Sequence, residues 1–110
     1  MAGSYYKQSV DFISNLTDKF EATDTDIPIF DEHLAKLQNV LGTAGYTYLQ
    51  IKDGTNIEII KVKETNGNLS VTRGLEQTTP TTFPKGSCIM WVLTSSAVRD
   101  IVCQMDCCPE

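Results

Sequence analysis

The chain has 110 residues, an apolar fraction of 41% and a net charge of −5. This length predicts one domain, and the apolar fraction excludes a disordered chain. The negative charge, with scattered lysines and arginines, argues against nucleic-acid binding, and no apolar run approaches the roughly 18 to 20 residues of a membrane span. Because the N-terminus lacks the apolar core of a secretory signal, we expect a soluble protein made in the cytoplasm.

We divide the chain into an N-terminal arm (1–8), one compact domain (9–102) and a C-terminal tail (103–110). The domain begins with an ambiguous segment, residues 9–20. Apolar residues recur there every three to four positions, which favours an amphipathic helix. The alternation of Phe12, Ser14 and Leu16 also allows a short strand. Of these two alternatives we favour the helix.

Residues 21–26 are acidic and rich in Thr, which predicts a turn. The run 27–30 predicts a short strand at a sheet edge, because Pro28 has no N–H to donate. A helix near 31–41 follows. We assign Asp31 as its N-cap and the glycines at 42 and 45 as its end.

The segment 46–72 predicts an antiparallel meander. Three runs rich in β-branched and aromatic residues cover 46–51, 57–62 and 69–72. Asp53-Gly54 separates the first two runs and Asn66-Gly67 the last two. Both pairs are strong hairpin signals, because tight hairpin turns need positive φ.

The remainder predicts a long loop, a last strand and a short last helix. The loop over 75–87 is rich in Thr and Pro, and we expect Phe83 to anchor it in the core. A strand near 88–93 precedes a helix near 95–102, capped by Thr94 or Ser95, with Val98, Ile101 and Val102 facing inward. The fold class is therefore α+β, mainly β, with a small antiparallel sheet or barrel.

The search for catalytic or metal-binding residues gives no candidate, and we assign no cofactor. The single histidine, His33, is interpreted as a surface residue of the 31–41 helix. Cys88 is expected to be a buried, inert thiol, and the cysteines at 103, 107 and 108 to be free thiols. Their spacing fits zinc poorly, and the aspartates at 24, 26 and 31 lack the order of a calcium loop. We therefore do not expect an enzyme.

Glu58 and Arg73 carry opposite charges at the end of the second hairpin farthest from its turn. They could form an exposed ion pair, worth about 0 to 1 kcal/mol. Alternatively, a buried Arg73 would donate to the carbonyls of the loop over 75–84, because its guanidinium has forked donors. Both alternatives are structural.

Around these residues the chain resembles a module of tailed-bacteriophage virion proteins, found in tail-fibre N-termini and in small collar, baseplate and adaptor proteins. Its most specific part is the run Val71-Thr72-Arg73-Gly74-Leu75-Glu76-Gln77-Thr78-Thr79. Gln77 stands where the family commonly has Gly, which takes positive φ more readily. Residues 22–29 are similar to the opening strand of the module, and residues 93–101 to its closing strand and helix. The resemblance spans about residues 12 to 102.

The resemblance implies a structural part of the virion, a tail, collar or fibre adaptor with no catalytic residues. It implies a homo-oligomer, with a trimer favoured, that binds other virion proteins and neither nucleic acid nor membrane. The implied structural residues are Glu58, Arg73, Gly74, Glu76, Thr78, Thr79, Phe83 and Gly86. For partner contacts we select Tyr5, Tyr6, Cys107 and Cys108. The alternatives are a capsid decoration protein and a host-directed binding module.

Overall fold

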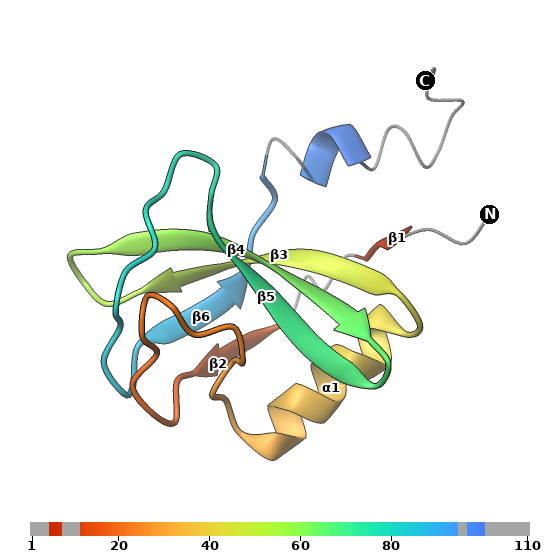
Figure 1. Ribbon diagram of the computed structural model, residues 1–110, viewed down its shortest axis with the longest axis horizontal. Helices are drawn as coiled ribbons and strands as arrows, with labels where there is room; N and C mark the ends of the chain where they lie inside the picture. Colours follow the sequence, from red (N-terminus) through yellow and green to blue (C-terminus); the bar gives the residue numbers. More distant parts are fainter. Residues whose placement is uncertain (1–4, 8–11, 95–96, 101–110) are drawn as a thin grey trace.

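The computed structural model describes residues 5–7, 12–94 and 97–100. They form one antiparallel sheet in the order β2-β6-β3-β4-β5, with β1 paired to β3 outside this path (Figure 1). The path is open, with β2 and β5 at its ends. The α+β, mainly β class predicted from the sequence is confirmed. The elements are β1 (Tyr5–Tyr6), β2 (Ile13–Asn15), α1 (Asp31–Leu41), β3 (Gly45–Lys52), β4 (Ile57–Thr65), β5 (Asn68–Leu75) and β6 (Cys88–Trp91), and residues 97–100 are helical.

The predicted meander is present as β3, β4 and β5. In the first turn the Asp53 carboxylate accepts the backbone N–H groups of Thr55 (3.0 Å) and Asn56 (2.7 Å). In the second turn Asn66 and Gly67 have φ values of 51° and 84°, the positive φ that an Asn-Gly hairpin requires. These local turns fix the register of β4 against both of its neighbours.

The larger of two hydrophobic clusters lies between the sheet, α1 and the segment that leads into α1. From α1, Leu37 and Leu41 are fully buried, as the apolar stripe of this helix predicts. Phe83 is fully buried as predicted. It faces Phe20 across an isolated bridge, in which each backbone N–H donates to the other residue's carbonyl at 2.9 Å. The long loop is therefore anchored to the first part of the chain.

The helix expected over residues 9–20 is wrong where the structure describes this segment, residues 12–20. Residues 13–15 form β2, which pairs antiparallel with β6. Phe12, Ser14 and Leu16 are buried and Ile13 is exposed. The segment therefore adopts the short strand that was the second alternative. A partner strand from the other end of the chain satisfies this backbone. Residues 8–11 lie outside the described part.

The strand expected over 27–30 is also wrong. This segment has no regular secondary structure. Ile27 and Ile29 are buried, but the main chain makes single contacts instead of a ladder, and the Ile29 N–H donates to the Ile27 carbonyl (3.2 Å). One of them runs from the Thr17 N–H to the Pro28 carbonyl at 2.8 Å. Proline cannot return a hydrogen bond, which agrees with this one-sided contact.

The boundaries of α1 match the prediction, but its N-cap does not. Phe30 occupies the N-cap position without a side-chain hydrogen bond, and Asp31 is the first helical residue, where its charge suits the helix dipole. At the other end, Gly42 has φ 65° and donates its N–H to the Gln38 carbonyl. Gly45 opens β3 and does not cap the helix.

The last helix begins as predicted, because the Thr94 hydroxyl accepts the Ala97 N–H at 3.0 Å. Ala97 is fully buried, whereas Val98, expected to face inward, is exposed. Ser95, Ile101, Val102 and the tail over 103–110 lie outside the described residues. Neither helix in the described part has the length and apolarity that crossing a membrane would require.

Candidate functional site

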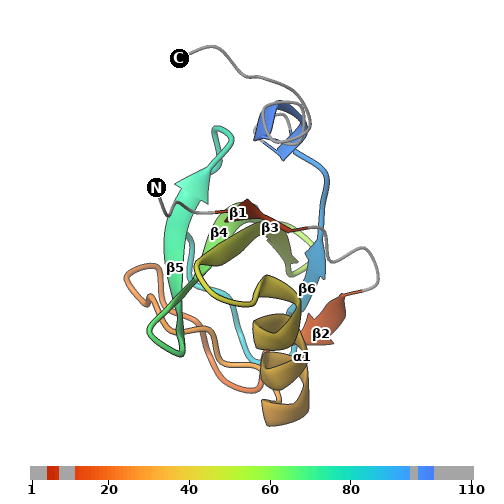
Figure 2. The ribbon, with the colours of Figure 1, turned by 90° about the vertical axis from the view of Figure 1, so that its right-hand side faces the viewer.

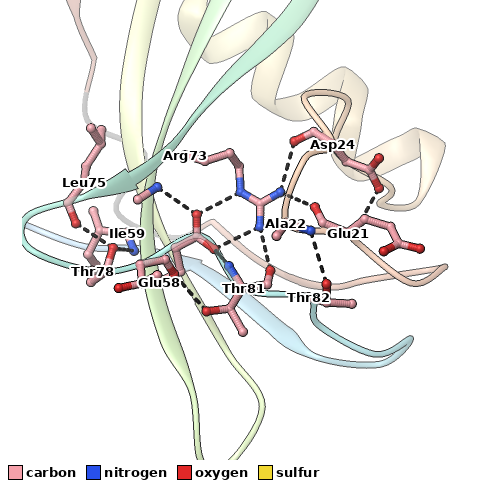
Figure 3. A network of polar contacts seen from close by, with 12 residues as sticks. Glu21, Ala22, Asp24, Glu58, Ile59, Arg73, Leu75, Thr78, Thr81 and Thr82 are labelled. Carbon is pink, nitrogen blue, oxygen red and sulfur yellow. Dashed lines mark hydrogen bonds and ion pairs between the residues drawn. The ribbon is translucent and has the colours of Figure 1, made fainter.

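The most elaborate polar site surrounds Glu58 of β4. Its side chain is 0% exposed. Oε2 accepts hydrogen bonds from Arg73 Nε (2.8 Å) and the Gly74 N–H (2.8 Å), and Oε1 from Arg73 Nη2 (2.9 Å) and the Thr81 N–H (2.9 Å) (Figure 3). A buried carboxylate costs several kcal/mol unless it is paired and hydrogen-bonded. Here both oxygens are fully used.

Arg73, in β5, is equally satisfied. Its side chain is 7% exposed. Besides Glu58, Nη2 donates to the Thr81 carbonyl (2.7 Å), and Nη1 donates to the carbonyls of Glu21 and Asp24 (Figure 3). These contacts employ every N–H of the guanidinium. The Phe20 ring lies against the cation, with Arg73 Cζ 4.1 Å from the ring centroid. We call Glu58, Arg73, Thr81 and the carbonyls of Glu21 and Asp24 the Arg73 cluster.

A β-bulge produces this geometry. The β4–β5 register shifts between the pairs Lys61↔Thr72 and Ile59↔Leu75. Bulges bend a strand and redirect side chains, and this one includes Arg73 and Gly74 near the end of β5. The Thr78 hydroxyl completes the ladder, because it accepts the Ile59 N–H (3.0 Å) and donates to the Leu75 carbonyl (2.6 Å).

Gly74 must be glycine here. It has φ 63°, and a Cβ atom would lie 2.6 Å from Cδ of Pro80 and 3.2 Å from the Thr78 carbonyl oxygen. The close approach of the loop to the strand therefore depends on the missing side chain.

The structure brings together five of the predicted structural residues at or beside the cluster: Glu58, Arg73, Gly74, Thr78 and Phe83. Thr79 is exposed and only its carbonyl is used, by the Thr81 hydroxyl (2.8 Å). Gly86 lies apart, where its N–H donates to the Leu16 carbonyl (2.8 Å). The structure combines the two alternatives for Arg73: it forms the ion pair with Glu58, but buried, and it donates to one carbonyl of the loop over 75–84, that of Thr81.

Sequence reasoning missed Thr81, Phe20 and the carbonyls of residues 21 and 24. A carbonyl is present at every residue, so its role has no sequence signal. The aromatic ring beneath the guanidinium could have been suspected only once Phe20 was known to bridge to Phe83.

The loop after β5 stores conformational strain. Glu76 (φ 55°) and Gln77 (φ 68°) both have positive φ, which costs a residue with a side chain about 1 kcal/mol. We therefore expect Gln77→Gly to raise the free energy of unfolding by about 0.5–1 kcal/mol, measured by urea denaturation. Thr79→Gly, at a position without positive φ, is the control and should lower stability. Equal losses from both substitutions would contradict the strain.

A second cluster lies on the other face of the sheet and contains three tyrosines. Tyr6, Tyr46 and Tyr48 are buried together, with Trp91 packed against them. The hydroxyls of Tyr46 (2.5 Å) and Tyr48 (3.1 Å) donate to the Asp100 carboxylate of the last helix. Tyr6 was expected to contact a partner, but it is 4% exposed within its own chain. Of Tyr5 only the backbone pairing in β1 is described, and Cys107 and Cys108 lie outside the described residues.

Burial and the Asp100 carboxylate raise the pKa of Tyr46, and they raise the pKa of Tyr48 to about 12. The folded state therefore holds the Tyr48 proton more tightly than the unfolded chain, whose pKa is near 10. We expect the stability contributed by protonated Tyr48 to be intact below pH 10 and to disappear as the pH rises to about 12. Asp100→Asn should lower the midpoint of tyrosinate formation, measured by ultraviolet absorbance. An Asp53→Asn control should leave it unchanged.

Among residues 5–7, 12–94 and 97–100, those with catalytic potential do not form an accessible centre. The Ser14 hydroxyl lies 2.6 Å from Nδ1 of His33, a contact that the sequence did not reveal, but Ser14 is buried. His33 is half-buried, and its ring packs against Phe30. Its hydrogen bond with Ser14 satisfies a buried hydroxyl. Cys88, expected to be buried, is half-buried in β6, which is short and lies next to the edge strand β2. The described residues contain no group of three or more His, Cys, Asp or Glu residues placed to bind a metal.

The surface hollows in the described part are shallow. One of them has a volume of about 370 Å³ and lies between the first hairpin turn and the segment 84–88. It is lined by Lys52, Asp53, Pro84, Lys85, Gly86, Ser87 and Cys88. No protein-family model matches the chain, and no curated protein shows significant similarity to it.

Proposed function

We propose that this chain is a structural component of a tailed-bacteriophage virion, an adaptor or fibre-anchoring part of the tail or collar that acts by protein–protein assembly. The observation that carries the proposal is the Arg73 cluster. Of the most specific residues of the resemblance, Arg73 lies in the cluster and ties two loops to the sheet, and Gly74 lies beside it with its N–H on Glu58. The guanidinium N–H groups of Arg73 and the N–H of Gly74 are used by internal contacts, so we assign both residues the role of shaping the loop surface.

The surface that the cluster builds supports the same proposal. Arg73 fixes the main chain of residues 21–24 and of Thr81, whereas Gln77, Thr79 and Pro80, in the loop that precedes Thr81, are exposed. Exposed loops on a rigid scaffold are the usual place for recognition. A held loop also loses less conformational entropy on binding than a free one. Loops 21–26 and 76–82 are therefore our proposed contact surface.

The experiment that tests the function is to count and locate the protein in purified virions, by quantitative mass spectrometry and by density maps of the particle. On the order of ten copies in the tail or collar, consistent with its cyclic symmetry, would support the adaptor. On the order of hundreds of copies on the shell would replace it with the decoration protein. Absence from the particle would overturn the proposal.

The contact surface is tested separately with particles that carry loop variants. Thr79→Glu changes an exposed side chain outside the Arg73 cluster, so the domain should fold normally. We expect this variant to incorporate into virions at a reduced level. Thr55→Glu, exposed in the first hairpin turn, is the matched control and should incorporate normally. Equal incorporation of both variants would exclude loop 76–82 as the contact surface.

A further inference from the structure

One edge of β3 is shared by two strands that come from opposite ends of the chain. β6 pairs antiparallel with residues 49–52, and β1 pairs parallel with Gly45 and Tyr46 (Figure 2). The chain after β6 leaves this edge once the Val92 N–H has reached the Tyr48 carbonyl (3.4 Å). The rest of the β3 edge is therefore open to another strand, and β1 fills it. We call this part of the edge the β1 slot.

Tyr6 is the residue that fills the slot. Its ring centroid lies 5.8 Å from those of Tyr46 and Tyr48, and its hydroxyl accepts the Trp91 Nε1–H (3.2 Å). The Lys7 N–H adds one main-chain contact, to the Tyr46 carbonyl (2.8 Å). A buried aromatic ring with a satisfied hydroxyl is the kind of anchor that dominates interface energies.

We infer that the β1 slot also accepts β1 from a second copy of this chain, so that copies associate by exchanging their arms. An identical arm would make each of these contacts in the receiving copy. The free energy cost of exchanging the arms is therefore low. The pairing in β1 covers only two residues. Tyr6 is the buried anchor among the described side chains of the arm, and a neighbouring arm at high local concentration can compete for its site. The slot is specific for this occupant, because it is complementary to a Tyr side chain on a parallel strand.

The test uses the full-length protein under reducing conditions, with equal amounts of isotope-labelled and unlabelled chains. We expect mixed dimers that increase with protein concentration in native mass spectrometry. In isotope-filtered NMR spectra, nuclear Overhauser contacts should join the Tyr6 ring of one copy to the Trp91 indole of the other. A monomer at all concentrations up to the millimolar range would overturn the inference. A dimer without these intermolecular contacts would overturn it as well.

Variants separate the arm from other apolar surfaces. Tyr6→Ala should weaken the dimer at least about tenfold, as expected for loss of a buried anchor. Ile57→Ala removes an exposed apolar side chain of β4 and should leave the dimer unchanged. The labelled wild-type experiment does not depend on either variant folding.

This inference deepens the proposed function, since it names a second copy as one assembly partner. The two can fail separately. If the protein is present in virions but is always a monomer in solution, only the arm exchange is overturned. Exchanged dimers of a protein that is absent from virions would overturn the proposed function alone.

Discussion

Replacing Arg73 with Met is expected to lower the free energy of unfolding by about 3–5 kcal/mol, the cost of breaking a buried ion pair by removing one partner. Met has a comparable length and keeps the apolar contact with Phe20. It leaves the Glu58 carboxylate without two hydrogen bonds and the carbonyls of residues 24 and 81 without donors, whereas the Glu21 carbonyl keeps the Asp24 N–H at 3.0 Å. Urea denaturation followed by circular dichroism would measure the loss.

The matched control is the exposed ion pair between Lys19 and Glu21, whose nitrogen and oxygen lie 3.3 Å apart. Lys19→Met should cost less than about 1 kcal/mol, because exposed pairs contribute little. In a double-mutant cycle, Glu58→Gln combined with Arg73→Met should cost clearly less than the sum of the single changes. A loss from Arg73→Met as small as that from Lys19→Met would contradict the structural role of the cluster.

The elements that sequence could predict are those specified by local chemistry. Both hairpin turns of the meander and the limits of α1 depend on residues close together in the chain: Asp53-Gly54, Asn66-Gly67 and Gly42. Residues 12–16 fit two periodicities, and the choice between them depends on β6, more than 70 positions later in the chain. Tertiary pairing overrides local preference in such a segment.

The Arg73 cluster was predictable only in part. The opposite charges of Glu58 and Arg73 on paired strands predicted their contact, and the long loop suggested further acceptors. The depth of burial was not predictable, because it depends on how Phe20 and the segment 21–24 fold over the pair. The pairing of β1 also had no local signal, since two tyrosines near a terminus are compatible with many environments.

Phe83→Ala is expected to lower the free energy of unfolding by about 3–5 kcal/mol, since it removes a fully buried aromatic ring and leaves a cavity. Phe83 is 0% exposed and bridges to Phe20, whose ring packs against the Arg73 guanidinium. The substitution should therefore also loosen the loop over 76–82, seen as faster amide hydrogen exchange at Thr81.

Phe30→Ala is the control: that ring is 49% exposed, and its loss should cost about 1 kcal/mol or less without changing exchange at Thr81. Equal losses would mean that Phe83 does not anchor the loop. A large loss with unchanged exchange would mean that the Arg73 cluster holds the loop without help from the aromatic bridge.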